Sequence, residues 1–264
     1  MFLVELYRAW RSSHRCPVRK RLKEVLRAYA MTFTFGWPLM AFMLTYVVCG
    51  KLKVVGHRNL LLALVRGKVI IAPNHPGVVE SLFISIVLVW LFPIVAPIVW
   101  PYAMPDAKTF LPKRLWWIYP FLRCITVDRS DESHTKKGTD VAKKRLADGE
   151  VVVIHGEGGR TCKLPADQEY LLGAQGRRLR PLKPGVMTLA LRIKGVRILP
   201  VWVEFNGPPI VTPERYRALL RRGLTIYFGE AYDPTQGLGP ELGRIPRATT
   251  ELARRILATG IEIE

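Results

Sequence analysis

The apolar residues of this chain fall into short continuous runs that predict a sheet buried on both of its faces. Runs rich in β-branched residues lie at positions 69–72, 124–127, 151–154, 198–203 and 224–228. A strand that is covered on both sides reads as one unbroken apolar run rather than as an alternating pattern. Helical patterns lie between and after these runs, at positions 135–146, 186–193, 214–222 and 247–258. The succession predicts an α/β fold with a mostly parallel, mixed central sheet flanked by helices.

Two longer apolar runs, at positions 28–50 and 81–105, contain no charged residue. The first is long enough to cross a bilayer, but Gly36 and Pro38 interrupt its middle and basic residues flank both of its ends. Because a membrane-spanning helix is expected to have asymmetrically charged flanks, we interpret this run as an embedded helical hairpin. The alternative is a pair of buried core helices. The second run is interpreted as a core helix followed by a strand and a loop.

The chain is strongly basic, with a formal net charge of +19 over 264 residues. A charge of this size indicates an anionic partner, which is a nucleic acid, an acidic lipid surface or a phosphate-rich substrate. The basic residues lie beside apolar stretches, which favours a lipid surface, and the chain carries no known nucleic-acid-binding motif. A basic protein that binds anionic lipid or nucleic acid without catalysis remains the alternative. The four cysteines show no paired spacing, which fits a reducing compartment.

Polar and ionisable residues follow three of the predicted strands. They are Asn74 and His75 after the first, Asp128 and Arg129 after the second, and His155, Glu157 and Arg160 after the third. In open α/β sheets, ligands bind beyond the carboxyl ends of the strands. We therefore expect these groups to converge in space although they lie far apart in the sequence.

The first of these groups contains a histidine and a carboxylate, His75 and Glu80, on either side of a Pro-Gly turn. Pro76 biases His75 toward an extended conformation and itself suits the first turn of a helix. Glu80 then lies near the start of a helix expected over residues 78–90, where the helix dipole favours an ionised carboxylate. A histidine oriented by a carboxylate is the minimal unit for general base catalysis.

The third group lies in a glycine-rich turn, residues 155–161, whose sequence is His-Gly-Glu-Gly-Gly-Arg-Thr. Glycines allow the backbone to approach a ligand closely and to present amide donors to an anion. Arg160 adds a guanidinium group suited to bidentate recognition of phosphate. Cys162, just after the turn, is interpreted as incidental, and the chain has no Gly-x-Ser-x-Gly sequence for a serine nucleophile.

Together these blocks resemble the lysophospholipid acyltransferase family, whose type members are the 1-acyl-glycerol-3-phosphate acyltransferases. Residues 74–80 are similar to its His-x4-Asp block, with Glu80 in place of the aspartate. Residues 127–129 resemble its second block, and residues 156–161 resemble its Glu-Gly-Thr-Arg block, with glycine where threonine is usual. The apolar fourth block corresponds to residues 198–201. The resemblance covers residues 50–235, and the blocks are in the family's order.

The resemblance implies a role for each residue of the blocks. His75 and Glu80 are the expected catalytic base and its orienting carboxylate. The expected substrate-binding residues are Arg129, Glu157, Gly158, Gly159, Arg160 and Lys183. The implied substrates are a thioester, acyl-CoA or acyl-carrier protein, and a lysophospholipid hydroxyl such as that of 1-acyl-glycerol-3-phosphate. No metal, other cofactor or nucleic acid is expected.

Some features leave alternatives open. Glu80 in place of aspartate also occurs in relatives that acylate lipid A precursors, so a glycolipid, ornithine-lipid or lipid A-type acceptor remains open. Residues 164–181 are longer than the family needs and carry Arg177, Arg178 and Arg180. This segment is either a substrate-reading loop or a solvated basic loop.

The expected organisation has two parts. Residues 1–50 form a basic amphipathic segment and a membrane-embedded helical hairpin, and residues 51–264 form the acyltransferase domain. The expected location is the cytoplasmic face of the inner or plasma membrane, where the positive charge meets anionic lipid.

Overall fold

The computed structural model of the chain describes residues 37–77, 101–106, 123–128, 130–161, 168–207, 221–236 and 243–261, together with positions 4, 26, 30, 34 and 84. The helix expected over residues 78–90 lies outside the described residues apart from Ile84, as does most of the helix expected over residues 214–222. Every structural statement below concerns the described residues.

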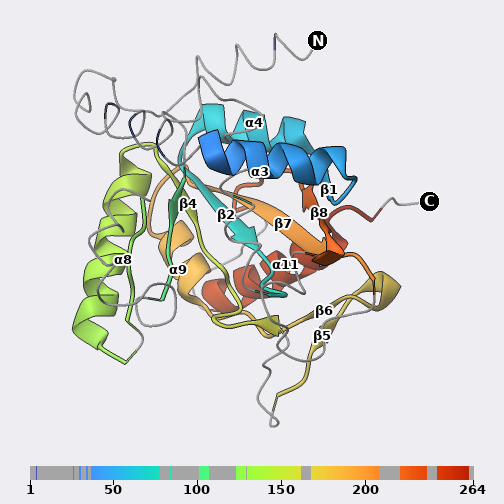
Figure 1. Cartoon of the computed structure of the whole chain (residues 1–264). Helices are drawn as coiled ribbons and strands as arrows, with labels where there is room; N and C mark the ends of the chain where they lie inside the picture. Colours follow the sequence, from blue (N-terminus) through green and yellow to red (C-terminus); the bar gives the residue numbers. More distant parts are fainter. Residues whose placement is uncertain are drawn as a thin grey trace.

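A six-stranded sheet with the strand order β1-β8-β7-β2-β4-β3 lies at the centre of the described structure (Figure 1). Its strands are β1 (Leu52–Val55), β2 (Val69–Pro73), β3 (Tyr102–Ala103), β4 (Val151–Val153), β7 (Arg197–Phe205) and β8 (Leu224–Phe228). Neighbouring strands are parallel except β7 and β8, which are antiparallel. The predicted mostly parallel, mixed sheet is therefore confirmed.

Helices cover both faces of this sheet (Figure 1). The helices are α3 (Trp37–Val48), α4 (His57–Arg66), α8 (Glu132–Ala147), α9 (Gly185–Leu191) and α11 (Arg244–Ala258). Strand β2 shows how the two faces arise, because its successive side chains point in opposite directions. Val69 and Ile71 pack with Leu60 of α4 in one core, whereas Ile70 and Ala72 lie in the other.

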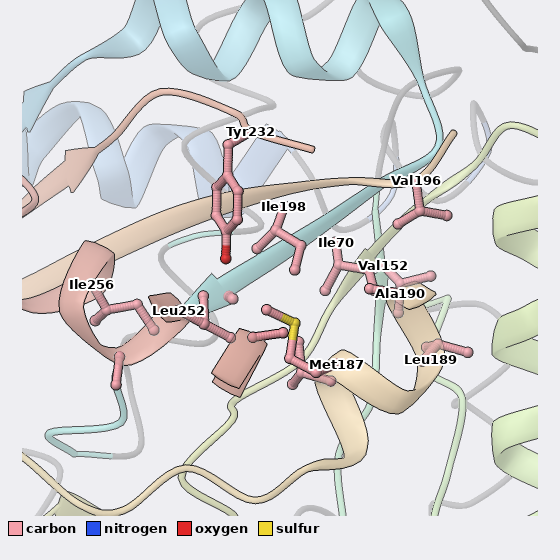
Figure 2. Packing of buried hydrophobic residues seen from close by; sticks show 14 of the residues in the cluster. Ile70, Val152, Met187, Leu189, Ala190, Val196, Ile198, Tyr232, Leu252 and Ile256 are labelled. Atoms are coloured by element: carbon pink, nitrogen blue, oxygen red, sulfur yellow. The ribbon is translucent and has the colours of Figure 1, made fainter. Parts of the chain in front are cut away.

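The second core lies between the sheet and the helices α8, α9 and α11. Figure 2 shows Ile70, Val152 and Ile198, from three adjacent strands, beside Met187 of α9 and Leu252 of α11. All five side chains are almost completely buried. Burial on both faces of the sheet explains why its central strands are continuous apolar runs in the sequence.

The segment at residues 124–127 differs from the prediction of a regular strand. It runs beside β3 and forms isolated bridges, Ala103 with Cys124 and Asp106 with Val127. The N–H of Ile125 donates to Ala103 O at 2.8 Å, and the N–H of Val127 donates to the oxygen of residue 105 at 3.2 Å. Residue 105 is a proline and has no N–H to return, so the ladder of hydrogen bonds is interrupted at that position.

The described part of the N-terminal region is the helix α3, which has 12 residues. Its Tyr46 packs into the first core, whereas Leu44 and Val48 are exposed. Among the described helices, none combines the length and apolar character that a membrane crossing requires. The remainder of the predicted membrane hairpin lies outside the described residues.

The arginine-rich segment forms a small antiparallel hairpin of β5 (Leu171–Leu172) and β6 (Arg178–Leu179), joined through the 3-10 turn η5 (Ala174–Gly176). Arg178 is exposed, as a solvated basic loop requires. Arg177 is only 5% exposed, and its Nη1 donates to Leu257 O at 3.0 Å and to Thr259 O at 2.6 Å. Because Arg177 anchors the hairpin to the end of α11, it fits neither of the two roles expected for this segment.

Candidate functional site

The candidate site forms at the carboxyl ends of β2 and β4, which are adjacent parallel strands (Figure 1). Ile71 pairs with Val153, so the residues that follow the two strands leave the sheet at the same edge. The imidazole rings of His75 and His155 consequently lie side by side, with ring centroids 4.3 Å apart and planes tilted by 30°. The expected convergence of the first and third polar groups is confirmed.

Asn74 fixes the position at which the chain leaves β2. Its side chain is 2% exposed and bonds to one residue of β7 in both directions, because Nδ2 donates to Val203 O at 3.0 Å and Oδ1 accepts from the N–H of Val203 at 2.7 Å. These bonds continue the pairing of β2 with β7 beyond Pro73. The residue that follows, His75, is therefore attached to a rigid strand end.

Glu157 is fully buried beneath the site. Its Oε1 accepts the backbone N–H of His75 at 2.5 Å, and its Oε2 accepts the backbone N–H of Arg180 at 3.0 Å. The hydroxyl of Thr161 lies 2.9 Å from both carboxylate oxygens. Burial raises the pKa of the Glu157 carboxyl, while the hydrogen bonds from Arg180, His75 and Thr161 act in the opposite direction. One carboxylate thus joins three separate segments of the site.

Further bonds attach the histidine to the glycine-rich turn. The N–H of Thr161 donates to His75 O at 2.7 Å, so both backbone polar groups of His75 are bonded to the turn. Nδ1 of His155 lies 3.2 Å from Asn74 O, and because a carbonyl oxygen can only accept, Nδ1 carries the hydrogen in this contact. The arrangement joins His75 and the turn into one continuous unit.

Two arginines lie at the open end of the turn. Nη1 of Arg180 donates to the backbone oxygen of Arg160 at 3.3 Å, which places the two residues next to each other. Within the described ranges, neither guanidinium forms an ion pair with a carboxylate. The backbone N–H of Lys183 donates to Gly156 O at 2.8 Å, and its side chain is exposed. The carboxylate of Glu157 binds backbone N–H groups, so among the described residues it leaves the positive charge of these two arginines without an ion-pair partner.

Two predicted site residues, Glu80 and Arg129, lie outside the described residues, so their roles stay predictions. The neighbours of Arg129 form a turn before α8, in which the N–H and hydroxyl of Ser130 donate to Asp128 Oδ1 at 3.0 and 2.6 Å. The candidate nucleophile Cys162 is likewise outside the described residues. Burial raises the pKa of the Cys124 thiol to about 12, so this cysteine is not a thiolate at neutral pH.

Three residues of the site had no individual role assigned from the sequence. Asn74 was named only as part of the polar group that directly follows a buried strand, and Thr161 only as the end of the glycine-rich turn. Arg180 appeared only as one of several arginines in a basic segment, because its hydrogen bond to Glu157 joins residues 23 positions apart.

Comparisons with known proteins found one family model and similar solved structures. The family model described as Acyltransferase matches residues 51–204, which is more than half of the chain and includes β2, β4, β7 and the glycine-rich turn. Among solved structures, the chain is similar to the 1-acyl-sn-glycerophosphate (LPA) acyltransferase PlsC from Thermotoga maritima. That match has 15% sequence identity and a TM-score of 0.44, and it covers 90% of this chain and 95% of the other. No curated protein sequence matches.

Proposed function

The chain belongs to the acyltransferase family, and from that membership we propose that it moves a fatty acyl group from a thioester to the hydroxyl of a lysophospholipid such as 1-acyl-glycerol-3-phosphate. The observation that carries the proposal is the junction of His75 with the glycine-rich turn. The buried carboxylate of Glu157 and the stacked ring of His155 hold a base beside an arginine-bearing turn. The proposed acceptor carries both a hydroxyl and a phosphate, so its site needs a base and a cationic group no farther apart than the length of one molecule.

In the proposed reaction, the imidazole of His75 accepts the proton of the acceptor hydroxyl as the hydroxyl oxygen attacks the thioester carbonyl. The resulting tetrahedral oxyanion collapses, the carbon–sulfur bond breaks, and the thiolate leaves with the carrier. The imidazolium then returns its proton to the thiolate, so the base is regenerated. Glu80 is proposed to hold the imidazole in its productive tautomer, as the carboxylate does in hydrolytic triads.

The charge of the chain fits substrates that lie in an anionic membrane surface. A net charge of +19 attracts both the surface and phosphate-bearing substrates, and it raises their local concentration. We propose that the enzyme works on the cytoplasmic face of the membrane, where acyl-CoA and acyl-carrier protein are present. Arg160 and Lys183 are proposed to contact the phosphate of the acceptor, together with Arg129.

Release of the thiol from acyl-CoA tests the proposed function. The full-length protein, purified in detergent, is incubated with oleoyl-CoA and a thiol reagent, with and without lysophosphatidic acid. We expect free coenzyme A to appear only when the acceptor is present, and diacylated product to appear at the same rate. Release without an acceptor would identify a thioesterase instead. The same assay is run with oleoyl-acyl-carrier protein. Absence of thiol release from both thioesters, together with a salt-sensitive gel shift of nucleic acid, would favour the alternative of a basic nucleic-acid-binding protein without catalysis.

Glu157 is proposed to support catalysis by holding His75 rather than by touching substrate. In the variant Glu157→Gln, the side-chain NH2 group cannot accept a hydrogen bond, so at least one of the N–H groups of His75 and Arg180 loses its partner in the interior. The backbone at His75 then shifts, and misplacement of a base by a fraction of an ångström slows the chemical step. We expect kcat to fall by about tenfold or more and the acceptor KM to change by a smaller factor.

The variant Glu251→Gln is the control, because Glu251 is a partly exposed carboxylate on α11 whose oxygens also accept hydrogen bonds, from the side chains of Arg254 and Arg255. It is expected to leave kcat unchanged. Thermal unfolding of both variants confirms that they are folded. An acceptor KM that rises while kcat is retained in Glu157→Gln would show that this carboxylate supports substrate binding and not the placement of His75.

A further inference from the structure

We propose that Arg180 is a second phosphate-binding guanidinium of the site, and that it occupies this place because residue 159 has no side chain. The inference rests on the proposed function and names a contact that the sequence blocks do not contain. Arg180 belongs to the arginine-rich segment, 20 positions after Arg160, yet the two residues are in direct contact. The ligand chemistry that fits is a phosphate monoester, which carries two negative charges near neutral pH.

The space at residue 159 is the first observation. A Cβ built on Gly159 would lie 2.5 Å from Nη1 of Arg180, closer than real Cβ atoms approach other heavy atoms. Gly159 does not have a positive φ, whereas the preceding Gly158 has a φ of 67°. Backbone strain is therefore not the reason for glycine at residue 159. Its lack of a side chain lets the guanidinium of Arg180 lie against the turn.

The second observation is how Arg180 is held. Its backbone N–H is bonded to the same Glu157 carboxylate that holds His75, so the main chain of Arg180 is fixed relative to the proposed base. Its Nη1 is directed at the backbone oxygen of Arg160. A guanidinium anchored in this way loses little conformational freedom when it binds an anion.

The third observation is the unsatisfied charge. Nε of Arg180 is buried and has no hydrogen-bond partner among the described residues, and no described carboxylate pairs with either arginine. A buried charged donor without an acceptor is unfavourable, and the Arg180 guanidinium lies against the backbone of a second basic residue, Arg160. An anion bound at the turn would offset the positive charge of both residues. A phosphate monoester offers enough oxygens to accept from both guanidinium groups and from the amides of the turn.

Such a phosphate occurs in two of the proposed substrates, as the head group of the acceptor and as the 3′-phosphate of coenzyme A. The test therefore titrates the purified full-length protein with glycerol 3-phosphate and, separately, with adenosine 3′,5′-bisphosphate, and follows heat by calorimetry. The variants are Arg160→Met, Arg180→Met and Gly159→Ala. The control is Arg178→Met, which removes an exposed arginine two residues away in the same hairpin.

We expect Arg160→Met and Arg180→Met each to weaken binding of the same phosphate about tenfold, the effect of losing one charge-assisted contact. Gly159→Ala displaces the end of a flexible side chain rather than backbone, so the protein stays folded while its affinity falls to nearly that of Arg180→Met. In the Arg180→Met background, Gly159→Ala should have little further effect, because the group it displaces is already gone. Arg178→Met should bind normally.

The outcomes separate the two ligand sources and the two proposals. A loss confined to glycerol 3-phosphate assigns the pair of arginines to the acceptor, and a loss confined to the adenosine compound assigns it to the donor. Unchanged affinity of Arg180→Met for both compounds overturns the inference, as does additive weakening by Gly159→Ala and Arg180→Met. These measurements do not require turnover. A wild-type protein that binds phosphate through both arginines but releases no coenzyme A would refute the proposed function alone.

Discussion

Replacing His75 with alanine is expected to abolish acyl transfer and to leave the protein folded. The proposed general base contributes about 10² to 10⁴-fold to the rate. His155, whose ring lies beside that of His75, donates from Nδ1 to the Asn74 carbonyl, so any activity that remains in His75→Ala would have to come from its Nε2. The imidazole of His75 is only partly buried, and the hydrogen bonds that fix this residue come from its backbone. Alanine preserves them.

The measurement is the acceptor-dependent release of coenzyme A, with thermal unfolding as the test of folding. His57→Ala is the matched control, because His57 is an exposed histidine at the start of α4 and takes no part in the proposed chemistry. It should retain full activity. If His75→Ala kept more than about a tenth of the wild-type rate, a smaller effect than that of a general base, the assignment of His75 would be wrong.

The strands that position the site were predictable because burial on two faces leaves a strong pattern. β2, β4, β7 and β8 are unbroken apolar runs, and each was expected within a few residues of its observed bounds. β1 and α4 were not expected. β1 is an edge strand of four residues with an exposed Lys53, and α4 buries only one side, through Leu60, Ala63 and Leu64. A short apolar run, such as residues 60–65 of α4, does not distinguish a helix from a strand by its pattern alone.

The location of the site was predictable, but the roles of its charged residues were not. The rule that ligands bind beyond the carboxyl ends of parallel strands was enough to bring His75 and the glycine-rich turn together. A glutamate among glycines, however, is interpreted from the sequence as an exposed residue that binds substrate. Glu157 is fully buried, and its hydrogen-bond partners are His75, 82 positions earlier, and Arg180, 23 positions later. Contacts at such separations follow from the packing of the sheet, which no local pattern contains.

Arg177 illustrates the same limit, and its replacement by methionine is expected to give the largest loss of stability among the changes considered. Its guanidinium donates to two backbone oxygens at the end of α11 and lies 4.7 Å from the ring of Trp202. Removing it leaves buried carbonyls without donors, at about 1–3 kcal/mol each, and removes a cation–π contact of about 0.5–2 kcal/mol. The ion pair with Glu204 contributes little, because its atoms are 3.9 Å apart and Glu204 is largely exposed.

The burial of the guanidinium opposes part of this stabilisation. Desolvation lowers the pKa of Arg177, with the Glu204 carboxylate acting in the opposite direction, which shows that the charge is held at a cost. Methionine removes that cost and keeps most of the apolar stem packed. The net loss expected for Arg177→Met is therefore about 2–4 kcal/mol, which corresponds to a fall of roughly 5–10 °C in Tm for a chain of this size.

Thermal unfolding in detergent, followed by circular dichroism, measures this fall. Arg178→Met is again the control, since Arg178 is exposed and its described contact is with the ring of Tyr170 at the surface of the hairpin, so its Tm should stay within about 2 °C of the wild type. Equal Tm values for the two variants would show that the end of α11 does not depend on Arg177. A fall confined to Arg177→Met would establish that one arginine of the basic segment is a structural anchor, so that positive charge in this region has to be assigned to function residue by residue.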